Sequence, residues 1–227
     1  MYDKNFKNGP SILTIVIGMK RQFLVIGALF LVCSLAMCVN QTQIPDKFFE
    51  SYGKIETTQN EIDTIYNSYW DQQTKRIDYV TTNREAGSVD HKYVLSMLES
   101  EVLLLDEIAS KNLNYSTQIS ELFDTVKDIK GDEAKSKANQ LVITLRTSQQ
   151  LLANNIGRYK GATQSVGAVM YYYATDANLS DPLISEDIKQ HDLNARGEFQ
   201  KGDEYLGQYY LAKEDANATY QELKKLK

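Results

Sequence analysis

Cysteine is almost absent from this sequence of 227 residues. Only two occur, Cys33 and Cys38, and both lie in the first 39 residues. The rest of the chain can therefore form no internal disulfide bond and offers no cysteine nucleophile. Its stability must come from the packing of side chains.

Proline and glycine are scarce as well, with three and twelve residues, which excludes collagen-like and linker-like chains. Hydrophobic residues make up 42% and charged residues 24%, which argues against a disordered chain and against a polytopic membrane protein. The sequence has no G-x-S-x-G elbow and no glycine-rich phosphate loop, and its only histidines are His91 and His191. We therefore predict that the protein is not an enzyme and carries no cofactor.

One long apolar run stands near the N-terminus. Residues 23–39 contain a single polar side chain, Ser34, and Lys20 and Arg21 come directly before them. A run of seventeen residues is slightly long for the core of a cleaved signal and slightly short for a span, so residues 19–39 are a signal peptide or a membrane anchor. The basic pair favours the cytoplasmic side, which places residues 40–227 outside the cytoplasm, at the cell surface or in the periplasm.

The end of this run, Leu35-Ala36-Met37-Cys38, resembles the lipobox of bacterial and archaeal lipoproteins. The resemblance implies a diacylglyceryl-modified Cys38 at the mature N-terminus, with the lipid as membrane anchor. It covers four residues, and Met37 stands where a small residue usually precedes the cysteine. Cleavage after Ala36 into a secreted form, and no cleavage at all, remain open alternatives.

Residues 1–18 leave two interpretations open. Met19, Lys20 and Arg21 look like the start of an ordinary signal peptide, which makes 1–18 a mis-assigned extension of the reading frame. The alternative is a genuine cytoplasmic head before the apolar run.

The part of the chain expected outside the cytoplasm is acidic. Four of the 25 basic residues and one of the 30 acidic residues lie before residue 40, which leaves 21 basic against 29 acidic residues in 40–227. Such a surface repels nucleic acid backbones and anionic lipid headgroups. We expect contact with the membrane through the N-terminal anchor and no nucleic-acid partner.

Apolar residues in 40–227 recur at spacings of three, four and seven, the period of an α-helix. No stretch alternates with a period of two for long, so we predict an all-α fold. Loop signals around Gly87, at Gly131 and at 176–182 divide the chain into segments of roughly 40, 43, 44 and 43 residues. Asn112 keeps the heptad phase of the second segment, which predicts one long helix with a polar layer.

Four helices of similar length joined by short loops favour an elongated, antiparallel up-down-up-down four-helix bundle, preceded by the hydrophobic leader helix. At about 1.5 Å per residue each helix would run about 60 to 65 Å. The loops at Gly87 and at 176–182 would share the end far from the membrane, whereas the Gly131 turn and the C-terminus would return toward it. The residues expected in one continuous core include Leu105, Leu122, Leu145, Leu152 and Phe199.

Glycines interrupt the third and fourth segments. Gly157 and Gly161 form a small-residue ladder that would let a neighbouring helix, or a tyrosine from it, approach closely. Gly197, Gly202 and Gly207 each lower helix propensity by up to about 1 kcal/mol relative to alanine. They favour a looser or bent fourth helix, and simple tolerance within a well-packed bundle is the alternative.

Two patterns come close to a metal site. His191 follows Asp187 by one helical turn, but the pair is two ligands short of a zinc site, so we prefer a surface ion pair or a core histidine. The oxygen-bearing side chains of residues 176–187 have a spacing that resembles an EF-hand calcium loop. Asp181 replaces the turn glycine and Pro182 follows it, which indicates a turn and a helix start instead. We predict no metal site.

Tyrosine is unusually frequent, with fifteen residues beside a single tryptophan. Counting helical turns brings both histidines, five tyrosines and one arginine to the end of the bundle far from the membrane. These candidate ligand or partner residues are Arg76, Tyr79, His91, Tyr93, Tyr171, Tyr172, Tyr173 and His191. Tyrosine suits binding because its ring supplies apolar area and its hydroxyl supplies a hydrogen bond. The alternative is that these rings only seal the end of the bundle.

Taken together, these features predict a membrane-tethered, extracytoplasmic helical-bundle protein, a lipoprotein by its resemblance, that acts in binding or as a surface spacer. Its partner would be an unidentified protein or small molecule. The alternative is a small-molecule sensor or carrier with a pocket in the bundle core, and extracytoplasmic four-helix sensor domains look similar in outline. A carrier needs a cavity and a spacer does not, so a cavity distinguishes the two.

Overall fold

The computed structural model describes residues 42–175 and 177–227, apart from the side chain of Glu85. The predicted leader at 19–39, with Cys38, and residues 1–18 lie outside the described residues. The described part is all-helical, with four helices and no strand, which confirms the predicted fold class to this extent. None of these helices combines the length and the hydropathy that a membrane span requires.

The helices are α2 (Asp46–Glu85), α3 (His91–Val126), α4 (Asp132–Ala174) and α5 (Pro182–Lys225). The predicted boundaries at Gly87 and Gly131 are confirmed, and both glycines adopt positive φ angles of 64° and 93° that other residues avoid.

The start of α5 and the start of α3 are each capped by an aspartate. Asp181 accepts a hydrogen bond of 2.9 Å from the backbone N–H of Leu183, with Pro182 in the first turn, so the helix-start interpretation is confirmed. Asp176, the first residue of the EF-hand-like pattern, lies outside the described residues. Asp90 accepts hydrogen bonds from the N–H groups of Lys92 and Tyr93. Helix α3 therefore begins at His91 and is 36 residues long.

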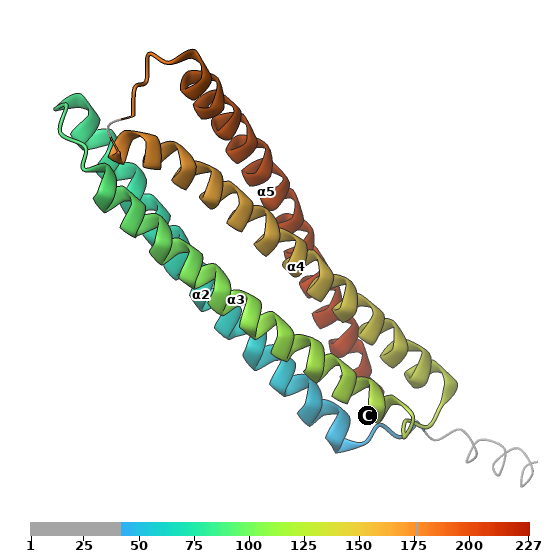
Figure 1. The fold of residues 1–227 in the computed structure, drawn as a ribbon. Coiled ribbons are helices and arrows are strands. Elements are labelled where there is room, and N and C mark those ends of the chain that lie inside the picture. Colours follow the sequence, from blue (N-terminus) through green and yellow to red (C-terminus); the bar gives the residue numbers. More distant parts are fainter. Residues whose placement is uncertain (1–41, 176) are drawn as a thin grey trace, which may run out of the picture.

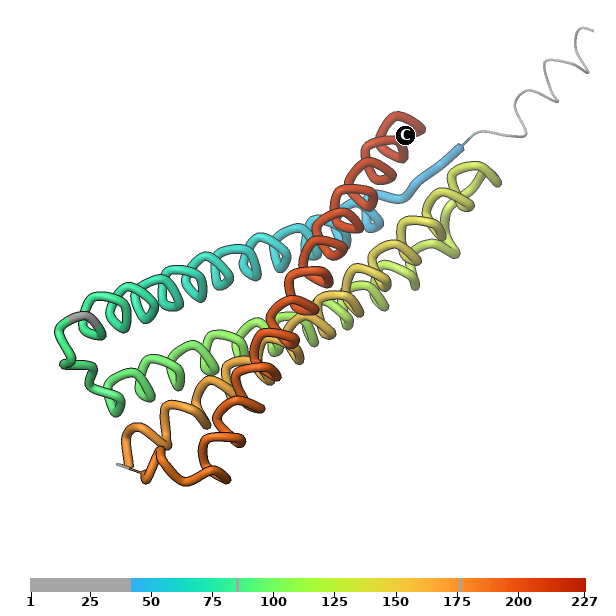
Figure 2. The backbone as a smooth tube through the Cα atoms, turned by 90° about the horizontal axis from the view of Figure 1, so that it is seen from above, coloured from blue at the N-terminus to red at the C-terminus, as the bar shows by residue number. Residues whose placement is uncertain are grey.

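Neighbouring helices alternate in direction and lie side by side in chain order (Figure 1). α2 packs on α3, α3 on α4, and α4 on α5, but the Cα atoms of α2 and α5 nowhere come within 8 Å of each other. The C-terminus and the α3–α4 turn lie beside the start of α2, where Gln43 and Lys130 exchange backbone hydrogen bonds of 3.2 and 3.0 Å. Toward the opposite end, which we call the distal end, α5 diverges from α2 (Figure 2).

The core is divided into two clusters, so the prediction of one continuous core is wrong. One cluster holds Leu122 and Leu145, and the other holds Leu105 and Leu152, with Phe199 only half-buried against it. Between the two, the helices bury polar side chains instead, namely Thr58, Gln59, Asn112 and Ser148. The polar layer predicted at Asn112 is confirmed, and it interrupts the apolar core because hydrogen-bonding groups displace apolar ones there.

Tyrosines span the distance between helices whose backbones do not touch. Tyr52 of α2 stacks on Tyr220 of α5 with ring centroids 3.7 Å apart. Tyr66 of α2 donates a hydrogen bond to Oδ1 of Asn155 on α4, and Asn155 donates in turn to the carbonyl of Gly202 on α5 at 2.8 Å. Long aromatic side chains therefore fill the centre of the helix group and hold α2 away from α4 and α5.

Gly202 has a packing role in α5, which is one continuous helix. A Cβ at this position would lie 2.4 Å from Cε1 of Tyr159. The sequence predicted that a neighbouring helix, or a tyrosine from it, would approach the ladder of Gly157 and Gly161. Helix α5 does approach Gly161, where an added Cβ would lie 3.6 Å from Oε2 of Glu198, but the tyrosine comes from the ladder helix and approaches α5. No atom would lie within 4 Å of a Cβ at Gly157.

Candidate functional site

A cavity of about 630 Å³ lies at the distal end, where all four helices contribute to its lining. It is open to solvent on one side, and it is larger than two other open pockets, of about 490 Å³ between α3 and α4 and about 460 Å³ between α2 and α5. Its apolar walls come from Val80, Val89, Val169, Met170, Tyr173 and Ile188. The cavity is lined by both helical hairpins, α2–α3 and α4–α5, at the end where the backbone of α5 has diverged from that of α2 (Figure 2).

Two of the predicted site residues form part of this wall. The imidazole of His91, at the first position of α3, stacks on the ring of Tyr173 from α4 with a centroid distance of 5.1 Å and an interplanar angle of 19°. The stack presents a flat aromatic face together with ring N–H and O–H groups. A ligand with an apolar body and a polar group could use both.

Charged side chains complete the lining. Arg84 comes from the last turn of α2, and Lys189 and Asp192 come from α5. Asp192 is paired with Arg196 at 2.9 Å, and Lys189 lies 3.7 Å from Glu186, with both of these side chains 69% exposed. An exposed pair of this length contributes little, so Lys189 stays available to a ligand.

A second group of predicted residues ties α4 to α5 beside the cavity. Tyr172 donates a hydrogen bond of 2.5 Å to Oδ2 of Asp187, and this bond raises the pKa of the tyrosine. The same carboxylate oxygen lies 3.6 Å from Nε2 of His191, so the two side chains predicted to meet at this turn are neighbours. These three side chains support the wall and are not among the residues that line it.

The other predicted tyrosines of the distal end, Tyr79, Tyr93 and Tyr171, are partly or largely exposed. Tyr79 and Tyr93 meet edge to face with centroids 4.9 Å apart, and the Tyr79 hydroxyl accepts a hydrogen bond of 3.2 Å from the backbone N–H of Asp90. Tyr171 is 60% exposed, which confirms that three consecutive tyrosines cannot all face the helix interior.

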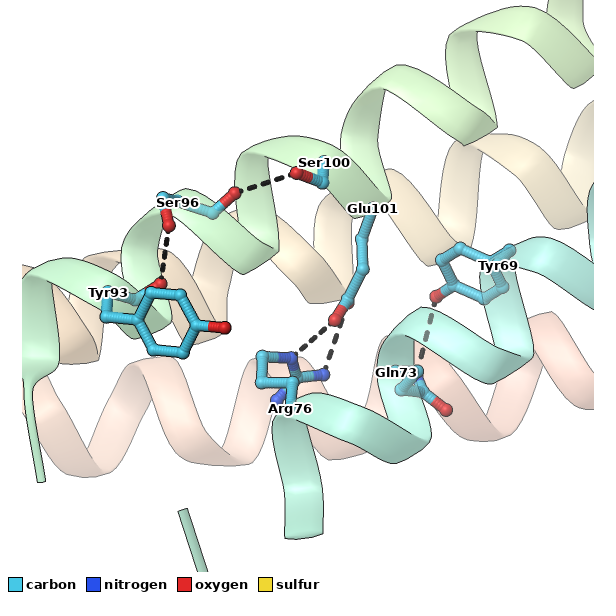
Figure 3. A network of polar contacts seen from close by, with 7 residues as sticks. All are labelled: Tyr69, Gln73, Arg76, Tyr93, Ser96, Ser100 and Glu101. Atoms are coloured by element: carbon cyan, nitrogen blue, oxygen red, sulfur yellow. Dashed lines mark hydrogen bonds and ion pairs between the residues drawn. The ribbon is translucent and has the colours of Figure 1, made fainter. Parts of the chain in front are cut away.

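Arg76 lies in the interior and does not line the cavity. Its guanidinium makes two hydrogen bonds to the carboxylate of Glu101, Nε to Oε1 at 2.6 Å and Nη2 to Oε2 at 3.2 Å (Figure 3). Burial raises the pKa of Glu101, and the hydrogen bond and charge of Arg76 oppose that rise. The pair joins α2 to α3 and is engaged without a ligand.

Most residues that line the distal cavity were not predicted from the sequence. The predicted site residues were tyrosines, histidines and Arg76, whereas Arg84, Met170 and Lys189 belong to the cavity. Helical spacing contained a usable signal, because Ser185, Ile188, Lys189 and Asp192 follow one another at intervals of three, one and three residues on one face of α5. Within the described part of the chain, no three histidine, cysteine or acidic side chains lie close enough together to hold a metal ion.

Comparisons with known proteins add no family to these observations. Family models, curated proteins and solved structures were searched, and none of them matches this chain.

Proposed function

We propose that this is a membrane-tethered, extracytoplasmic binding protein that captures a small ligand at the distal end of an elongated four-helix bundle. The leader at 19–39 holds one end at the membrane, and the binding cavity lies at the other end. The observation that carries the proposal is the cavity of about 630 Å³ lined by all four helices.

The size and composition of this cavity favour binding over a passive spacer. Pockets that bind small molecules have volumes of roughly 300 to 1,000 Å³ and are mostly apolar with a few polar groups. The distal cavity has this character, with six apolar residues and charged side chains from α2 and α5. A spacer needs no cavity, so the carrier interpretation is preferred, with the pocket at the bundle end and not at its centre.

Exposed tyrosines of α3 and α4 near the distal end offer further contact area for a partner. Tyr93 is 49% exposed and Tyr171 is 60% exposed, although seven other tyrosines are buried in the core. Exposed rings cost solvation free energy that a binding partner recovers. The distal end also lies farthest from the proposed tether at the start of α2, where a ligand from outside has free access.

The site is tested by a screen of small molecules with ligand-observed NMR on the full chain in lipid nanodiscs. Ser185 is exposed and lines the cavity, so Ser185→Trp fills it without disturbing the core. Ser120→Trp, at an exposed position of α3 outside this cavity, is the matched control. We expect molecules that bind the wild type and the control and not Ser185→Trp. A screen in which every binding molecule is retained by Ser185→Trp would show that the distal cavity is not the site.

The tether is tested separately by detergent-phase partitioning. Cys38→Ser should move the protein to the aqueous phase if a lipid on Cys38 is the anchor. Retention in the detergent phase, with no labelled lipid on the parent protein, would assign anchoring to an uncleaved leader helix.

A further inference from the structure

Resting on the proposed function, we infer that the ligand of the distal cavity is an organic acid with an apolar or aromatic body, bound as its anion. The apolar walls take the body of the molecule, and two cationic side chains at the cavity take its acidic group. The juxtaposition of these two surfaces in one cavity carries the inference.

The walls provide three kinds of apolar contact. Val80, Val169 and Ile188 supply branched aliphatic surface from α2, α4 and α5, and Tyr173 supplies a ring that already stacks on His91. Met170 adds a polarizable thioether, which adapts to ligand shape and favours aromatic rings. An apolar or aromatic body therefore finds complementary surface on several sides.

The cations come from two different hairpins. Arg84 ends α2, and Lys189 lies in the first half of α5, so only the tertiary structure brings them to one cavity. The dipole of α2 also stabilises a positive charge in the last turn of the helix, which accounts for Arg84 even without a ligand. The helix dipole does not account for Lys189, because this residue lies in the N-terminal part of α5, where a positive charge is not stabilised by the dipole.

The single acidic side chain of the lining does not cancel these cations. Asp192 lies 2.9 Å from Arg196 on α5, so a third cation stands beside the acidic side chain of the lining. The chain as a whole carries a formal charge of −5, so two cations at one apolar cavity run against the general charge of the molecule. An anionic ligand is the partner that stabilises this arrangement, because guanidinium and ammonium groups hydrogen-bond strongly to carboxylates.

The test uses three probes with one skeleton and different charge: phenylbutanoate, phenylbutanol and phenylbutylamine. Binding to the full chain in nanodiscs is measured by calorimetry, with empty nanodiscs as the blank. We expect phenylbutanoate to bind roughly tenfold more tightly than phenylbutanol, and phenylbutylamine to bind most weakly. Ser185→Trp should abolish binding of phenylbutanoate, and Ser120→Trp should leave it unchanged.

Charge variants locate the anionic group. Arg84→Gln and Lys189→Gln should each weaken phenylbutanoate roughly fivefold and leave phenylbutanol unchanged. Lys201→Gln is the matched control, because Lys201 is an exposed basic residue of α5 outside the cavity. A uniform loss in all three variants would mean that long-range charge, and not contact, determines binding.

The outcomes separate this inference from the proposed function. If phenylbutanol or phenylbutylamine binds as tightly as phenylbutanoate and Ser185→Trp abolishes that binding, the distal site stands and the anionic ligand is refuted. If phenylbutanoate binds equally well to Ser185→Trp, or does not bind at all, the inference is overturned, and the small-molecule screen decides the proposed function on its own.

Discussion

Gly202 offers the sharpest test of the packing in this structure. A Cβ added there would lie 2.4 and 2.5 Å from two ring carbons of Tyr159, closer than real side chains pack. The ring has no room to move, because it is fully buried, lies 5.7 Å from Tyr69 and 5.4 Å from Trp70, and donates a hydrogen bond of 2.7 Å to Asp203. Gly202→Ala should therefore force helix α5 away from α4.

The magnitude follows from a comparison within one helix. Gly197 and Gly207 are exposed positions of α5 with no atom within 4 Å of an added Cβ. Alanine at any of the three positions gains about 1 kcal/mol of helix propensity, so this gain cancels in a comparison between them. Overpacking at Gly202 costs about 1 to 3 kcal/mol, and this is the expected gap in unfolding free energy between Gly202→Ala and the two controls.

The assay is thermal and denaturant unfolding of the full chain, followed by circular dichroism of the helices. For a body of this size the gap corresponds to a difference in melting temperature of roughly 2 to 12 °C. Gly197→Ala and Gly207→Ala should be as stable as the wild type or more stable. In a Tyr159→Leu background the penalty of Gly202→Ala should disappear. If Gly202→Ala were as stable as the controls, the close packing of Tyr159 on α5 would be wrong.

Three further predictions concern buried polar groups. Glu101→Gln leaves the Arg76 charge buried and unpaired and should cost about 3 to 5 kcal/mol, whereas replacing both partners with Met and Leu should be close to neutral in denaturant unfolding. Burial raises the pKa of Tyr115 to about 12, so its contribution to stability is complete below about pH 10 and is lost as the pH rises toward 12. Tyr115→Phe should make that part of a stability profile against pH less steep, while the other buried tyrosines with raised pKa values keep the rest of the slope. Tyr66→Phe removes the donor to Asn155 and should cost about 1 to 3 kcal/mol, and an unchanged unfolding midpoint would contradict the bridge between α2 and α4.

Much of the helical architecture could be predicted from the sequence, because helix ends and buried faces depend on residues close together in the chain. Gly131 marks a turn through its own backbone angles, and Asp181 starts α5 through its own side chain. Leu105 and Leu152 are buried because heptad spacing places them on inward faces of their helices. Asn112 stays in phase with them, so its place in a polar layer was visible too.

The candidate site could be predicted only in part. Counting turns brought His91 and Tyr173 to one end of the molecule, and the structure stacks them in the cavity wall. The same count placed Arg76 near that end, but it could not show that Glu101 on the next helix would engage its guanidinium. Helical spacing places Lys189 on the same face of α5 as Ile188 and Asp192, but the sequence does not show that this face borders a cavity, since a lysine on a helix looks the same in sequence whether it faces solvent or a cavity.

What only the tertiary structure decided is how the two helical hairpins sit against each other. Tyrosine is a residue of both cores and binding surfaces, and the sequence does not say that Tyr159 enters the core whereas Tyr171 faces solvent. Aromatic side chains such as Tyr52 and Tyr220 bridge α2 and α5 across a separation that brings no Cα atoms within 8 Å. That separation depends on the combined volume of side chains from helices far apart in the chain. The distal cavity follows from it, because α5 diverges from α2 where such bridges end.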